Sequence, residues 1–143
     1  KPGLEVRQPQ ARQMACRQSR LSILPLKWQG HRNFIFMDDI MYIERELRKS
    51  RIVLPEQEHY VYMTLEELMD RLQEQRFIRI HKSYIVNFDH ISEFCRQSIV
   101  LRDGTQLPVS RTYRAAVSER IHQLLKEAGV KLDEEKQDEE SAA

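Results

Sequence analysis

A succession of short apolar runs, each of the length of a β-strand, constrains the fold of this chain more than any other feature. From about Leu24 onward one short apolar run follows another, and polar or turn-forming residues separate them. Runs of this length are typical of β-strands, and Asp103 with Gly104 can supply a tight hairpin turn between two of them. The pattern predicts a mostly β protein. The runs span residues 34–36, 40–43, 51–54, 60–63, 77–80, 84–86, 91–94, 98–101 and 106–109.

The period changes to that of a helix in two places. Thr64 and Glu67 have the spacing of a capping box, and apolar residues then recur on one helical face, which predicts a helix over 64–75. A second helical period runs from about Thr112 to Gly129, which is placed to end the helix. The sequence therefore predicts two helices, one inserted between strands and one at the C-terminal end. Expected core positions are Leu68, Leu72, Val86 and Ile121.

Charge divides the chain into three parts, although its net charge is only +1. Residues 1–23 contain five Lys or Arg and one Glu, whereas residues 127–143 contain two Lys and seven acidic residues. Neither end has the apolar content to offset the entropy of ordering. We therefore expect a flexible basic arm over 1–23, one domain over 24–128, and an acidic disordered tail over 129–143.

Several classes of protein are disfavoured. Cys16 and Cys95 have no metal-ligand spacing and form no disulfide framework. No apolar run approaches the roughly 18 residues of a membrane span, and the N-terminus lacks the core of a signal peptide. The chain has no nucleophile elbow, no glycine-rich phosphate loop and no metal-spaced His pair. We expect a cytoplasmic protein that is not an enzyme and needs no cofactor.

The segment 77–87 is the more informative of two candidate binding segments. Alternation places Arg79 on the face opposite Ile78 and Ile80, and the strand breaks at Lys82 and Ser83. A cation and a hydroxyl at such a junction can reach a phosphate or a base edge. A solvated turn is the alternative interpretation.

The second candidate segment, 107–113, places Ser110 and Arg111 where a strand ends and a helix begins. The N–H groups of a helix N-terminus favour a phosphate there, or Ser110 caps the helix. Arg111 can form a bidentate contact with a guanine edge, or it forms a surface ion pair.

Together these two segments, the turn at Asp103 and Gly104, and residues 39–44 and 65–68 upstream resemble the LytTR domain of LytR/AgrA-type bacterial regulators. The resemblance covers about residues 24–125. It implies an elongated, mostly antiparallel β fold in a response regulator-like transcription factor. It also implies loops that enter successive major grooves of double-stranded DNA at promoter direct repeats, with a monomer free in solution and two copies on DNA.

Carried over residue by residue, the resemblance assigns DNA contacts to Lys82 and Arg111. Ser83, Ser110 and Arg79 stand beside them, and His81 is expected to be mainly structural. The loop after Glu44 supplies a third contact, for which position alone indicates Arg48, Lys49, Ser50 and Arg51.

A protein-interaction or single-stranded RNA-binding β module is the alternative function. In that interpretation Phe77 and Tyr84 serve as platforms on which bases stack. We expect both aromatic residues instead to be core or half-buried strand residues.

Overall fold

The computed structural model describes residues 22–73 and 76–130. Almost all of the predicted arm and tail, together with Cys16, lie outside the described residues. In chain order the elements are β1 (Ile23–Trp28), β2 (His31–Phe36), η2 (Met37–Asp39), β3 (Tyr42–Glu46), β4 (Lys49–Val53), β5 (Glu58–Val61), α3 (Leu65–Leu72), β6 (Phe77–His81), β7 (Tyr84–Asn87), η3 (Phe88–His90), β8 (Ile91–Phe94), β9 (Ser98–Leu101), β10 (Gln106–Pro108), η4 (Arg111–Tyr113) and α4 (Arg114–Glu127).

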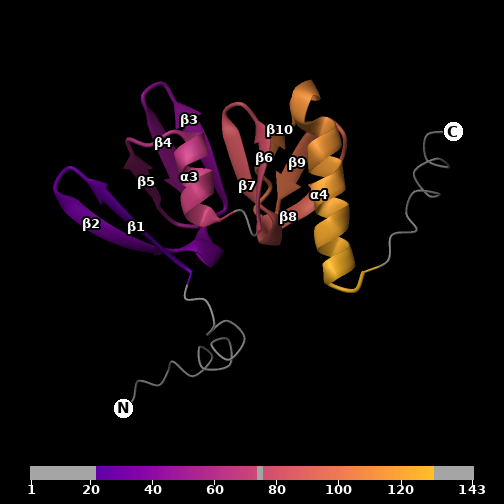
Figure 1. Ribbon diagram of the computed structural model, residues 1–143, viewed down its shortest axis with the longest axis horizontal. Coiled ribbons are helices and arrows are strands. Elements are labelled where there is room, and N and C mark those ends of the chain that lie inside the picture. The colour runs from indigo at the N-terminus through magenta and orange to yellow at the C-terminus, as the bar shows by residue number, and fades with distance from the viewer. Residues whose placement is uncertain (1–21, 74–75, 131–143) are drawn as a thin grey trace, which may run out of the picture.

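The strands form three antiparallel sheets that follow one another along the long axis of the molecule (Figure 1). The β1–β2 hairpin lies at one end, and a five-stranded sheet of order β5-β4-β3-β7-β6 occupies the middle. A three-stranded sheet of order β10-β9-β8 and helix α4 form the other end. The predicted elongated, mostly β fold with two helices is confirmed.

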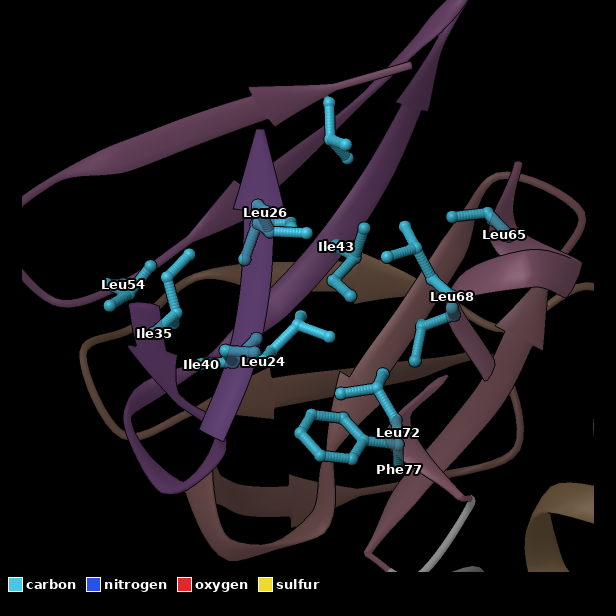
Figure 2. Packing of buried hydrophobic residues seen from close by; sticks show 13 residues of the cluster. Leu24, Leu26, Ile35, Ile40, Ile43, Leu54, Leu65, Leu68, Leu72 and Phe77 are labelled. Carbon is cyan, nitrogen blue, oxygen red and sulfur yellow. The ribbon is translucent and has the colours of Figure 1, made fainter. Parts of the chain in front are cut away.

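One hydrophobic core covers one face of the five-stranded sheet (Figure 2). The β1–β2 hairpin contributes Leu24, Leu26 and Ile35, and α3 contributes its apolar face to the same cluster. The capping box that begins α3 is present, since Glu67 N donates to Thr64 Oγ1 at 3.1 Å and Thr64 N donates to Glu67 Oε1 at 2.9 Å. The helix ends at Leu72, earlier than predicted, because Gln73 adopts a left-handed backbone with φ 59°.

A second core covers the opposite face of the same sheet. Ile78, Ile80 and Val86 pack there against the three-stranded sheet and against Val117, Ile121 and Leu124 of α4. Phe77 points to the first core. Strand β6 is therefore buried on both faces, which explains its near-continuous apolar sequence. All four core positions expected from the sequence, Leu68, Leu72, Val86 and Ile121, are buried.

The connection expected between Ile43 and Ile52 is mostly regular strand. Strand β3 continues to Glu46 and β4 begins at Lys49, so that only Leu47 and Arg48 form the turn. Charged residues continue the strands here because opposite charges face one another across the ladder, as Glu44 does with Arg51. The hairpin formed by β3 and β4 thus extends farther than the apolar pattern indicated.

Candidate nucleic-acid interface

Three turns lie along one edge of the molecule, at the top of Figure 1. They are the β3–β4 turn at Leu47 and Arg48, the β6–β7 turn that contains Lys82, and the junction of β10 with η4 at Ser110 and Arg111. The two segments that the sequence singled out are therefore neighbours in space, and the β3–β4 turn extends their row.

Backbone hydrogen bonds tie these turns to one another. Arg45 N of β3 donates to Ser83 O at 2.8 Å, and Ser110 N donates to Ile80 O at 3.0 Å. The second bond depends on an irregularity in the β6–β7 ladder between Arg79 and His81, which leaves Ile80 outside the regular pairing. The three turns are consequently held in a fixed spacing, which lowers the ordering entropy that binding a rigid partner would cost.

Each turn presents one exposed cation. Arg48, Lys82 and Arg111 are all exposed, and none of them forms an ion pair within residues 22–73 and 76–130. Three unpaired cations on fixed turns suit a polyanion with regularly spaced phosphates or groove edges.

Arg79 lies beneath the β6–β7 turn, and its guanidinium is bonded on several sides. Nε donates to His81 O at 2.9 Å and Nη2 donates to Lys82 O at 2.8 Å, while Nη1 lies 3.3 Å from Glu66 Oε2. The guanidinium carbon also lies 5.7 Å from the ring centre of Tyr113 in η4. The pKa of Glu66 is lowered by its backbone N–H and by Arg79. Arg79 thus braces two of the three turns.

Comparison with known proteins identifies the family. The profile of the LytTr DNA-binding domain matches residues 31–122, well over half of the chain. This chain belongs to the LytTr DNA-binding domain family. A solved LytTr DNA-binding domain from Bacillus cereus has 25% sequence identity and a TM-score of 0.59, with 70% of this chain and 95% of the solved chain covered.

The named relatives are longer proteins than this chain. The sensory transduction protein LytT of Bacillus subtilis (strain 168) is 29% identical over 89 residues, which cover 59% of this chain and 37% of LytT. The transcriptional regulatory protein BtsR of Salmonella typhi is 26% identical over 110 residues, which cover 73% of this chain and 45% of BtsR. The chain spans less than half the length of these relatives. Its family is a DNA-binding domain of regulators rather than a family of enzymes.

Two global properties of the LytTr domain complete this description. In the described ranges 22–73 and 76–130, no helix has both the length and the apolar character needed to span a membrane. The same residues contain no group of three side chains placed to ligate a metal ion.

Arg51, a predicted DNA contact, is bonded to carboxylates on the flank of the LytTr β3–β4 hairpin. It pairs with Glu44, with Glu46 at 2.9 Å and with Glu58 at 2.9 Å. Burial acts to lower the pKa of Arg51, but hydrogen bonds to Glu44 and Glu58 outweigh it and the net pKa is raised. The side chain holds β3, β4 and β5 together and is not free to contact DNA.

Ser50 is the clearest correction to the predicted site. It lies on β4, its exposed fraction is 0%, and its hydroxyl donates to Met63 O at 2.6 Å. The prediction of a contact through this side chain is wrong, because strand alternation turns Ser50 inward and leaves Lys49 on the opposite face. Lys49 is half-buried, with its ammonium 4.4 Å from the ring centre of Tyr60.

The remaining predicted residues support the turns. Ser83 N donates to His81 Nδ1 at 3.0 Å, which agrees with a mainly structural role for His81. Ser110 precedes η4 but forms no side-chain cap, so its hydroxyl is not used by the helix and its N–H is used by Ile80.

Two surface residues on this edge were missed from the sequence. Leu47, at the tip of the β3–β4 turn, is 92% exposed and has a left-handed backbone with φ 57°. That conformation costs a residue with a Cβ about 1–2 kcal/mol. Arg96, exposed in the β8–β9 turn, lies near Ser110 because Val109 N donates to Gln97 O at 3.0 Å. The only sequence signal for either is its position in a short connection.

Proposed function

We propose that this domain recognises specific sequences in double-stranded DNA, as the DNA-reading part of a bacterial transcription regulator. Its three cation-bearing turns enter successive major grooves along one side of the duplex. The observation that carries the proposal is the single edge on which Arg48, Lys82 and Arg111 lie unpaired, on turns tied to one another by backbone bonds.

The chemistry of the three cations suggests a division of roles. Arg111 has the planar fork that matches the two acceptors of a guanine, whereas Lys82 is a point charge that accepts a phosphate or a base edge. Arg79 and Ser83 act behind them by fixing the β6–β7 turn. Arg48 and Lys49 carry the third contact at the β3–β4 turn, and Ser110 offers its hydroxyl beside Arg111.

Promoter direct repeats are the proposed target, with one copy of the domain on each repeat and a monomer free in solution. The sequence has no heptad seam that would hold a dimer. It does present Ile23, Phe34 and Phe36 on the outer face of the β1–β2 hairpin, where they are 37%, 67% and 57% exposed. Residues of the two strand faces alternate along the sequence, so this apolar face is not evident from the sequence alone. The oligomeric state of the domain without DNA must therefore be measured, by sedimentation.

The test uses DNA duplexes that carry two copies of the sequence that this domain selects from a random pool. Moving one repeat by half a helical turn places it on the opposite side of the duplex, so gel shifts are expected to show a loss of two-copy binding. Moving it by a full turn restores the phase. Indifference to spacing, or a stable dimer without DNA, would contradict the proposed arrangement.

The single-stranded RNA alternative finds little support in the aromatic residues that it requires. Phe77 is only 5% exposed and belongs to the first core. Tyr84 is half-buried, and its hydroxyl donates to Glu44 at 3.2 Å. A competition assay between double-stranded and single-stranded DNA or RNA of the same sequence separates the two functions, and a preference for single strands would refute the first.

A further inference from the structure

Leu47 is an apolar side chain at the tip of a turn whose neighbours are charged. A single exposed apolar residue is ordinary on a protein surface. Leu47 differs in two respects: almost its whole surface is in water, and its backbone is left-handed at a hairpin position that glycine or asparagine usually fills. Neither packing nor turn chemistry explains a leucine here.

The surrounding β3–β4 hairpin holds this tip rigidly. Arg51, on β4, binds carboxylates on both neighbouring strands, Glu44 and Glu46 on β3 and Glu58 on β5. Arg51 offsets part of the negative charge of Glu46, the acidic residue next to the tip, and Lys49 lies opposite Glu46 in the β3–β4 ladder. Arg48 follows Leu47 directly and adds an unpaired positive charge.

We propose that Leu47 reads the C5-methyl group of a thymine in the major groove, an inference that rests on the proposed DNA-binding function. The thymine methyl is the apolar group on the base edges of the major groove, where the other groups are hydrogen-bond donors and acceptors. An aliphatic side chain at the tip of a loop that enters this groove buries its surface against that methyl, while Arg48 binds nearby. Leu47 is therefore a specificity-determining residue at this turn.

The experiment begins with selection of bound duplexes from a random-sequence pool by the parent protein and by Leu47→Gly. Glycine adopts the left-handed conformation without a Cβ clash, so this variant is expected to melt at or above the parent's temperature. A weaker affinity in an equally stable variant cannot then arise from misfolding. The parent's selected sequence is expected to contain a thymine that the variant no longer prefers.

Each thymine of the selected duplex is then replaced singly by deoxyuridine, which removes only the methyl group. At one position per repeat the parent is expected to bind about fourfold more weakly, the change that corresponds to exposing one methyl-sized group. Leu47→Gly is expected to bind both duplexes equally. Restoring a methyl at that position with 5-methylcytosine paired to guanine should recover part of the parent's affinity.

Val130→Ala is the matched control, because Val130 is an exposed aliphatic residue beyond the far end of α4. It is expected to keep the parent's full sensitivity to deoxyuridine. The inference is overturned if the parent ignores every methyl, if parent and Leu47→Gly respond alike, or if Leu47→Gly changes only the cooperativity between two bound copies. A pool with no enriched sequence overturns the proposed function itself, and the inference with it.

Discussion

Replacement of Arg79 tests whether this half-buried side chain stabilises the β6–β7 turn or instead contacts DNA directly. Arg79 has a side-chain exposure of only 18%, and its guanidinium donates to His81 O and Lys82 O at 2.9 and 2.8 Å. Each hydrogen bond from a charged donor contributes about 1.5–3 kcal/mol. Arg79→Met loses both, so we expect a decrease of about 3–6 kcal/mol in the free energy of unfolding. Arg79→Lys can keep one and should lose about half as much.

The effect on DNA binding follows from the freedom that the turn gains. Fixing the backbone of one mobile residue costs about 1–2 kcal/mol, so releasing Lys82 alone should weaken specific binding about tenfold. Binding to random DNA should change little in Arg79→Lys, because the charge is kept. The slope of log affinity against log salt should stay that of the parent in both variants, whereas loss of a phosphate contact would reduce it by about one unit.

Salt-dependent gel shifts and urea unfolding measure these quantities, with Arg71→Lys and Arg71→Met as controls on the exposed side of α3. The controls should leave both stability and specific binding unchanged. One outcome would falsify the brace: Arg79→Lys binds and unfolds like the parent while Arg79→Met loses one unit of salt slope. Arg79 would then be a phosphate contact.

Four further predictions concern binding, the core and the ends of the chain. Arg111→Ala should weaken specific binding by about 1–3 kcal/mol and relax the sequence preference at one base pair. Arg111→Lys should lose most of the same binding free energy, because lysine lacks the planar fork of arginine. Binding by Arg111→Lys equal to that of the parent would contradict the assignment. Leu72→Ala, in a side chain only 2% exposed, should lower the free energy of unfolding by about 2–5 kcal/mol in urea titrations, and an unchanged midpoint would count against the packing of α3. Deletion of residues 1–21, with five cations and one Glu, should weaken specific and random duplexes by the same factor, and a loss confined to the specific duplex would refute this. Limited proteolysis of the full chain should leave a resistant core near residues 24–128, and protection of the basic arm would show that boundary to be wrong.

Local patterns in the sequence predicted most elements of this fold, although they missed strand β1 (Ile23–Trp28). The short apolar runs formed strands, Thr64 and Glu67 formed a capping box, and Gly104 adopted the positive φ of a hairpin turn. These features depend on residues only a few positions apart, so the sequence displays them directly. The motifs around Lys82 and Arg111 likewise indicated the family, because they lie at strand ends in a definite order.

Only the tertiary structure decided which cations are free to bind and how the turns are spaced. Arg51 and Arg111 are equally basic in the sequence, yet packing surrounds one with three carboxylates and leaves the other exposed. The bonds from Arg45 to Ser83 and from Ser110 to Ile80 join residues that lie far apart in the chain. Such partners are set by the register of the strands and by an irregularity in one ladder, and no local pattern encodes either.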